Sequence, residues 1–225
     1  MGKRNPWDEV AQVYEENRPS YPEQLIDDLI DKAQLTTDDR LLEIGAGTGK
    51  ATTLLAKRGF QIHCIEPGMN LAGILTQKCS CYPKVSIDIA SFEEWIPAGD
   101  MKFDLIFSAQ AFNWLEPDIR YRKCRQLLKN GGYLALFWYG HDNEPWESDI
   151  AYSGMFQHPQ VFKYHMESTL DCESYIKTME STSTYALMGK EAKSEMREQA
   201  LNDIRQQGGF VNTSLNYQLY LAKAI

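Results

Sequence analysis

The sequence predicts an α/β fold built around a mainly parallel β-sheet. Strand-like and helix-like segments alternate between residues 40 and 139, as expected when helices connect parallel strands. The first apolar segment runs into a glycine-rich turn and then into a helix-like segment. Hydrophobic residues make up 43% and charged residues 24% of the 225 residues, which is typical of one globular domain with a modest appendage.

The central part of the chain contains five expected strands. They cover residues 40–44, 61–65, 85–89, 103–108 and 133–139. The last of these is apolar almost throughout, as a central buried strand should be. Helices are expected at residues 50–58, 71–78 and 117–129. The first of these helices stops at Gly59 and the last at Gly131-Gly132, which are good C-terminal signals.

The two flanks of this alternation are organised differently. An amphipathic N-terminal stretch over residues 7–30 contains a turn before a helix at residues 23–32. Residues 141–157 are expected to be irregular, followed by strands at 160–167 and 214–222 and helices at 171–179 and 190–206. We expect a single domain with an N-terminal cap (1–35), a cofactor-binding core (36–140), a small helical lid region (141–209) and a closing strand (210–225).

Composition narrows the partners and the location. No apolar run approaches the ~18 residues that span a membrane, and the N-terminal residues form no apolar signal segment. We therefore expect a cytoplasmic protein that does not bind membranes. The net charge of −8 disfavours nucleic acid as a partner. The five cysteines match no disulfide or zinc pattern, so reduced thiols and no metal site are expected.

The strongest local signal is the segment LEIGAGTG at residues 42–49. Glycines allow a tight turn and let a ligand approach the main chain. The helix that follows has unpaired N–H groups at its first turn. The segment predicts a site for a nucleotide-type ligand.

An acidic residue at the end of the second expected strand supports this prediction. Glu66 lies 21 residues after Gly45 and is followed by Pro67. A carboxylate at this place can accept hydrogen bonds from both hydroxyls of an adenosine ribose.

The charge of the turn favours one adenosine ligand over another. The spacing is GxGxG, and acidic Glu43 precedes it by two residues. An anion repels the pyrophosphate of NAD but attracts a ligand that carries an ammonium group. S-adenosylmethionine carries an amino group, a carboxylate and a sulfonium, and it is therefore the favoured cofactor.

Residues 43–49 resemble motif I of the class I S-adenosylmethionine-dependent methyltransferases. The segment YEENRPSYP at residues 14–22 is similar to that of the small-molecule branch that includes trans-aconitate and ubiquinone-biosynthesis methyltransferases. SFEEW (91–95), FDLI (103–106), AQAFNW (109–114) and LLKNGG (127–132) follow in the order of that branch. The resemblance implies a Rossmann-like, seven-stranded sheet of order 3-2-1-4-5-7-6, with strand 7 antiparallel and helices on both faces.

The resemblance also implies roles for individual residues in binding the cofactor. It places one group around the methionine portion: Gly45, Ala46, Gly47 and Gly49. It places Glu66 on the ribose and a second group by the adenine: Met69, Ala90, Ser91 and Phe92. It places Ala109 and Gln110 at the amino-acid end. Tyr14 and Arg18 would close over the cofactor, with Arg18 a partner for its carboxylate.

Residues that follow strands four and five are candidates for the acceptor pocket, because ligands of α/β sheets bind at the carboxyl edge. They are Asn113, Trp114, Trp138, Tyr139 and His141. Asn113 stands where the branch often has histidine, so no catalytic base is assigned. The expected function is methyl transfer to an unidentified small-molecule O, N or C nucleophile. Two alternatives stay open: a nicotinamide-dependent oxidoreductase and a catalytically inactive cofactor-binding partner subunit.

Overall fold

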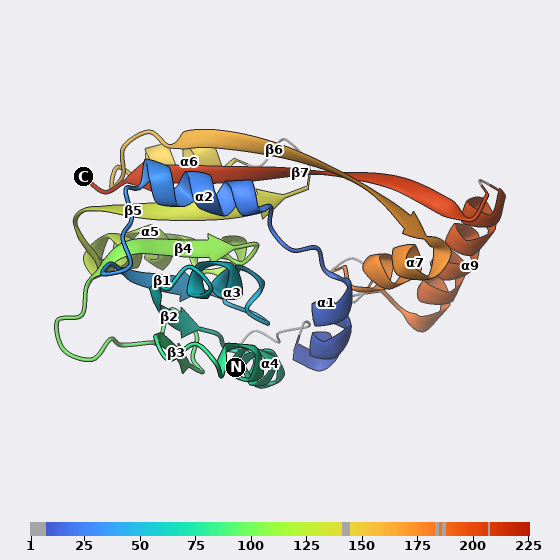
Figure 1. The fold of residues 1–225 in the computed structure, drawn as a ribbon, viewed down its shortest axis with the longest axis horizontal. Coiled ribbons are helices and arrows are strands. Elements are labelled where there is room, and N and C mark those ends of the chain that lie inside the picture. Colours follow the sequence, from blue (N-terminus) through green and yellow to red (C-terminus); the bar gives the residue numbers. More distant parts are fainter. Residues whose placement is uncertain (1–7, 141–144, 183–184, 186–187, 207) are drawn as a thin grey trace.

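The structure, a computed structural model, describes residues 8–140, 145–182, 185, 188–206 and 208–225. Its centre is one seven-stranded sheet of order β3-β2-β1-β4-β5-β7-β6 (Figure 1). Strand β7 runs antiparallel to both of its neighbours, and the pairs among β1 to β5 are parallel. The predicted fold class and strand order are therefore confirmed.

The elements lie close to their expected positions. The strands are β1 (Arg40–Ile44), β2 (Gln61–Ile65), β3 (Val85–Asp88), β4 (Phe103–Ala109), β5 (Leu128–Tyr139), β6 (Gln160–Asp171) and β7 (Phe210–Lys223). The helices are α1 (Ala11–Asn17), α2 (Glu23–Lys32), α3 (Lys50–Ala56), α4 (Met69–Cys79), α5 (Pro117–Leu127), α6 (Trp146–Tyr152), α7 (Cys172–Glu180) and α9 (Lys190–Gln206). Two short 3-10 helices are η1 (Asp8–Val10) and η2 (Phe112–Trp114).

Two expectations about element boundaries were wrong. The helix expected to reach residue 129 ends at Leu127, because Leu128 already pairs with Phe103 of β4. The pairing then shifts register, and Gly131 with φ +77° lies in this irregular part of β5. The glycines thus mark an irregularity inside a strand rather than a loop.

The second error concerns the segment that was expected to be irregular after Gly140. Residues 146–152 form α6, whose Trp146 and Ile150 are buried. Two apolar residues four positions apart are too few to produce a recognisable helical period in the sequence. Residues 141–144 lie outside the described residues.

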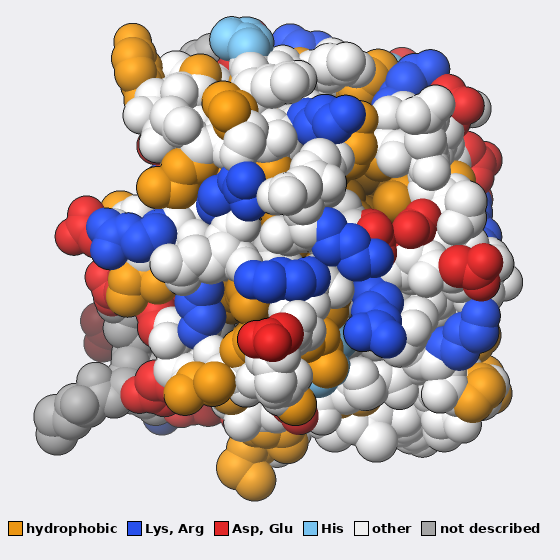
Figure 2. Space-filling model, turned by 90° about the vertical axis from the view of Figure 1, so that its left-hand side faces the viewer, with side chains coloured by type: hydrophobic (Ala, Val, Ile, Leu, Met, Phe, Trp, Pro, Cys, Tyr) orange, Lys and Arg blue, Asp and Glu red, His pale blue; other side chains and the backbone are white. Residues whose placement is uncertain are grey.

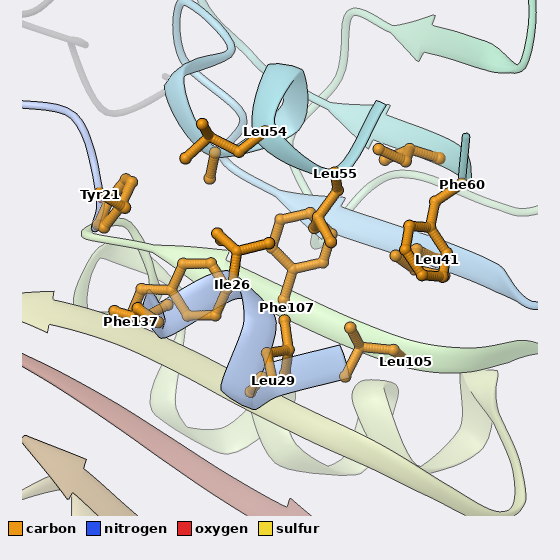
Figure 3. Close-up of a cluster of buried hydrophobic side chains, with 14 of the residues drawn as sticks. Tyr21, Ile26, Leu29, Leu41, Leu54, Leu55, Phe60, Leu105, Phe107 and Phe137 are labelled. Carbon is orange, nitrogen blue, oxygen red and sulfur yellow. The ribbon is translucent and has the colours of Figure 1, made fainter. Parts of the chain in front are cut away.

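Helices cover both faces of the sheet, and alternate strand residues supply the two cores. On one face, α2 and α3 pack on β1, β4 and β5; Figure 3 shows Ile26, Leu29 and Leu55 directed at Phe107 and Phe137. On the other face, α5 and α6 pack on the residues in between, such as Leu42 and Leu134. Each fully buried leucine or phenylalanine contributes roughly 1.5–3 kcal/mol, so these two layers hold the strands of the site rigidly.

The last two strands extend beyond the rest of the sheet. β6 and β7 pair over twelve residues each, and their far end carries α7 and α9 (Figure 1). Residues 217–222 of β7 are continuously buried, whereas its first half alternates between exposed and partly buried residues. The hairpin is therefore part of the core at one end and a projecting arm at the other. Among the described residues, no helix has the length and apolar character needed to cross a membrane.

Candidate functional site

The glycine turn joins the carboxyl end of β1 to α3. Gly45 has φ +69°, and a Cβ at this position would lie 2.4 Å from the Cβ of Ala111. Its N–H donates to the carbonyl oxygen of Ile65 at 2.8 Å, which ties the turn to the end of β2. Gly49, with φ +80°, precedes the first residue of α3. The left-handed backbone and the close contact explain why glycine is needed at residue 45.

Glu66 lies at the end of β2, where it contacts the glycine turn. Its side chain is 3% exposed, and its two oxygens accept N–H bonds from Gly47 and Gly68, each at 2.8 Å. Burial raises the pKa of the Glu66 carboxyl, and these two N–H donors oppose the rise. The structure therefore places this carboxylate beside the turn, and its ribose-binding role stays a prediction.

Glu43 is the second buried carboxyl group next to the turn. The Thr52 hydroxyl donates to its Oε2 at 2.5 Å, while its Oε1 has no hydrogen-bond partner among the described residues. Burial raises the pKa of Glu43 to about 8, although the bond from Thr52 lowers it. At neutral pH the group is thus mainly protonated in this state, whereas the sequence had suggested a plain anion. A nearby cation would stabilise its ionised form.

The segment of residues 8–18, which we call the N-terminal strap, is fastened to this edge of the sheet by polar contacts. Asp8 accepts N–H bonds from Asn70 and Leu71 at the start of α4, at 2.7 and 3.1 Å. Glu15 pairs with Lys78 of α4 at 2.6 Å. Lys50, the first residue of α3, donates to the Glu15 carbonyl oxygen at 2.6 Å.

Sequence reasoning missed these fastening residues. The partners of Glu15 lie 35 and 63 residues away along the chain, so no local spacing links them. Of the described side chains in the strap, Ala11 alone is fully buried. Polar contacts, rather than a hydrophobic core, therefore hold the strap in place.

Arg18 connects the strap to both the sheet and the arm. Its Nη1 donates to the Tyr139 hydroxyl at 2.9 Å, and its Nε donates to the carbonyl oxygen of Ser181 at 3.1 Å. Its guanidinium carbon lies 5.4 Å from the centre of the Tyr14 ring. The structure thus brings together Tyr14, Arg18 and Tyr139, which were predicted separately, and adds Ser181 just after α7.

The residues after β2 and β3 that were predicted to bind the cofactor, Pro67 among them, have different environments. Met69 is 71% exposed, and Pro67 is also exposed. Ala90 and Ser91 are partly buried. Phe92 is 2% exposed and belongs to the second core cluster. Its packing in the core gives Phe92 a structural role, so contact with a ligand stays a prediction for this group.

The candidate acceptor residues separate into two groups. Asn113 and Trp114 are exposed in η2, which follows β4, and Tyr139 ends β5 beside Arg18. Trp138 instead packs against Trp146, with ring centres 5.4 Å apart. His141 lies outside the described residues.

Two further residues complete this edge of the sheet. Ala109 is the last residue of β4. Gln110 follows it with φ +60°, and its amide donates to the carbonyl oxygen of Tyr139 at 2.9 Å. A left-handed backbone at a non-glycine residue is unusual, and the hydrogen bond holds the side chain between the ends of β4 and β5.

Residues 42–136 match the family model described as a methyltransferase domain. The matched segment is less than half of the chain. The match begins within β1 and ends within β5, so this methyltransferase domain includes the glycine turn, Glu66 and η2. It does not support the alternative of a nicotinamide-dependent oxidoreductase.

Curated relatives carry the same domain. An uncharacterized methyltransferase of Mycobacterium bovis is 35% identical over 130 residues, which are 58% of this chain and 50% of that protein. One from Schizosaccharomyces pombe is 32% identical over 135 residues, 59% of this chain and 52% of the relative. The chain thus spans about half the length of the curated relatives it matches. Their names specify no acceptor, so the branch suggested by the sequence stays a prediction.

Solved structures share the fold of the whole methyltransferase domain. The YcgJ protein from Bacillus subtilis superimposes with a TM-score of 0.64 at 15% identity, covering 90% of this chain and 99% of that one. Phosphoethanolamine N-methyltransferase 2 of Haemonchus contortus, in complex with S-adenosyl-L-methionine, gives a TM-score of 0.61 at 16% identity and covers 96% of this chain and 57% of that one. These likenesses confirm the Rossmann-like methyltransferase fold.

Proposed function

We propose that this protein transfers a methyl group from S-adenosylmethionine to a small-molecule acceptor at the carboxyl edge of its sheet. The observation that carries the proposal is the pair of buried carboxyl groups, Glu43 and Glu66, on either side of the glycine turn. A pyrophosphate at the start of α3 would keep Glu43 in its protonated form, whereas an ammonium group would stabilise its ionised form. A ligand with ribose hydroxyls and an ammonium group suits the two carboxyl groups instead.

The residues present fit this cofactor. Oε1 of Glu43 is a buried acceptor without a donor among the described residues, and an ammonium group has N–H donors to offer. Glu66 would hold the ribose hydroxyls, and Arg18 would face the carboxylate. The backbone of Gly45, Ala46, Gly47 and Gly49 would surround the methionine portion. When bound, S-adenosylmethionine supplies a methyl group activated by the positive sulfur.

The chain contributes positioning and exclusion of water. Asp8 and Glu15 hold the strap to α4, and Lys50 holds it to the start of α3, so the strap would limit solvent access to a ligand at this edge. Holding two reactants in line contributes roughly 7–11 kcal/mol to a barrier reduction. The amide of Asn113 can orient an acceptor but cannot take up a proton at neutral pH. The acceptors that suit the site are therefore already nucleophilic, such as carboxylates.

The remaining sequence expectations belong to the same proposal. We place the protein in the cytoplasm with a small-molecule acceptor rather than nucleic acid, in line with the net charge of −8. Residues 36–140 would act as the cofactor-binding core and 1–35 as the cap. Within residues 141–209, α7 and α9 would form the helical lid, while β6 completes the sheet.

Thermal unfolding with four ligands tests the proposal. We expect S-adenosylmethionine and S-adenosylhomocysteine to raise the melting temperature, and NAD and NADP to leave it unchanged. A ligand at 100 times its dissociation constant adds about 2.7 kcal/mol, which is roughly 5–10 °C for a domain of this size. Transfer of a labelled methyl group to carboxylic-acid, phenol and amine mixtures then tests turnover. A shift with a nicotinamide alone would refute the proposed cofactor.

A further inference from the structure

A groove of about 540 Å³ lies at the opposite, amino edge of the sheet, between α5 and the connection that leads from β3 to β4. Its apolar lining includes Ile96, which is 84% exposed, and Ile119, which is 36% exposed. Its cationic lining consists of Lys102, Arg122 and Lys123. Figure 2 shows this end of the molecule, where Lys and Arg side chains gather with apolar side chains exposed among them.

Two exposed cations of the groove, Lys102 and Arg122, form no ion pair with a carboxylate of the described residues. Lys102 donates to the carbonyl oxygen of Gln126 at 2.5 Å. Lys123 is less available, because it donates to the carbonyl oxygens of Phe92, Glu93 and Trp95, and the Glu93 carboxylate partly offsets the lowering of its pKa by burial. Carbonyl oxygens fix an ammonium group in place but leave its full positive charge. Asp100 is the acidic residue among those that line the groove.

Several cations elsewhere on the surface pair with carboxylates instead. Arg58 pairs with Glu23 and Asp27, and Lys78 pairs with Glu15. The protein has a net charge of −8, whereas the groove lining has three cationic residues and one acidic residue and is therefore net positive. Lys102, which contacts the last turn of α5 through Gln126, is favourable to the helix dipole. That effect explains part of the charge, but it explains neither the groove nor the exposed Ile96.

We propose that this groove binds an acidic peptide segment of a partner protein, with an aliphatic side chain of the segment against Ile96 and Ile119. The charge of the groove is complementary to carboxylates, and its volume is in the range of ligand-binding pockets. The apolar surface is concave, which does not suit a flat bilayer. Trp95, the aromatic residue of the lining, is only 6% exposed, so it offers no face for stacking a nucleic-acid base.

The groove lies at the other end of the strands from the glycine turn, so the proposal does not depend on methyl transfer. Fluorescence anisotropy with a labelled twelve-residue peptide of aspartate, glutamate and leucine tests it directly on the full chain. We expect saturable binding that weakens at least fivefold between 50 and 200 mM salt. A peptide with serine in place of leucine, and one with amides in place of carboxylates, should each bind at least fivefold more weakly.

Variants locate the binding. The double change Lys102→Glu and Arg122→Glu, and separately Ile96→Ser, should each weaken binding at least tenfold. All three residues are exposed, so these variants should keep the wild-type melting temperature. Matched controls on other surfaces are Lys163→Glu on β6 and Tyr152→Ser on α6, which should bind the peptide as the wild type does.

Three outcomes would overturn the proposal. The first is the absence of saturable binding. The second is binding that the groove variants and the control variants affect equally. The third is tighter binding of a single-stranded oligonucleotide or of phosphatidylserine vesicles than of the peptide, since either would show that the groove recognises negative charge alone.

Discussion

The two edges of the sheet handle charge in opposite ways. At the carboxyl edge, Glu43 and Glu66 are buried, and the lysines nearby pair with Glu15 of the strap. At the amino edge, Lys129 pairs with Asp104, but the groove exposes Lys102 and Arg122, and Lys102 donates to a carbonyl oxygen. Charged and ionisable groups are therefore buried beside the glycine turn and exposed to solvent in the groove.

This difference separates two kinds of ligand site on one sheet. Buried carboxyl groups gain most from a ligand that is itself enclosed, because electrostatic interactions are stronger away from water. Displayed cations act at longer range and are screened by salt. The carboxyl edge is thus suited to a small enclosed cofactor, and the amino edge to a partner that docks from solution.

The largest expected effect comes from Glu66. Glu66→Gln keeps one acceptor oxygen but loses the charge that the ribose hydroxyls would meet. A hydrogen bond to a charged group contributes about 1.5–3 kcal/mol, so the affinity for S-adenosylhomocysteine should fall roughly 10- to 100-fold. Isothermal titration measures this change. Glu94→Gln, at an exposed residue, is the control; equal loss in both variants would contradict the assignment.

The glycine turn should be intolerant of a methyl group at Gly45. Gly45→Ala combines a left-handed backbone with a 2.4 Å approach to Ala111, so unfolding should become about 2–4 kcal/mol easier. The matched control is Gly73→Ala in α4, where a Cβ meets nothing within 4 Å. The higher helix propensity of alanine should raise the free energy of unfolding of this variant by roughly 0.5–1 kcal/mol. Chemical denaturation compares the two variants. A Gly45→Ala protein of normal stability would show that the turn has room to relax.

Glu43 should make stability and cofactor affinity depend on pH. Its folded pKa, about 8, lies above the unfolded value, so the folded protein binds more protons between these two values. The stability that Glu43 contributes is present at low pH and is lost as the pH rises toward and through 8, by at most about 1.4 kcal/mol per unit. Urea unfolding from pH 5.5 to 8.5 should show this slope in the wild type and a smaller one in Glu43→Gln. Affinity for the ammonium-bearing ligand should rise over the same range in the wild type only.

The ion pair of the strap should control how long the cofactor stays bound. Lys78→Gln removes the contact of α4 with Glu15, and it should raise the dissociation rate of S-adenosylhomocysteine about fivefold, consistent with about 1 kcal/mol. Lys177→Gln removes the pair with Glu173 on the exposed surface of α7 and should leave the rate unchanged. Stopped-flow fluorescence measures both rates. Identical rates in wild type and Lys78→Gln would mean that the strap does not cover the ligand.

The smallest expected effect separates the two edges. Arg122→Glu at the groove should leave the affinity for S-adenosylhomocysteine within twofold of the wild-type value. The residue is exposed on α5, and the cofactor site lies at the other ends of the strands. A larger change in affinity would mean that the two edges are coupled and would contradict the independence of the two sites.

The sequence predicted the central strands well because buried strands and glycine turns are local patterns. The boundaries of β1 and β2 and the glycine turn agree with expectation. The start of β5 was missed because a pair of glycines, here Gly131 and Gly132, occurs both at helix ends and at irregularities within strands. For α6, the seven residues are too few for a clear period.

The sequence could predict those residues of the candidate site that lie at or next to the ends of strands. Glu66 and Glu43 lie at strand positions that the motif identifies. The fastening contacts of Glu15, Lys50 and Lys78, and the bond from Arg18 to Ser181, join segments far apart in the sequence. Such contacts depend on how the helices pack, and no spacing along the chain encodes them.

A crystal structure of the protein with S-adenosylhomocysteine tests the central claim most directly, because it shows what the two carboxyl groups of the carboxyl edge bind. We predict that both ribose hydroxyls donate to Glu66 and that the ligand's ammonium group lies within hydrogen-bond reach of Glu43. A ligand bound elsewhere, or bound here with neither ribose hydroxyl donating to Glu66, would contradict this prediction.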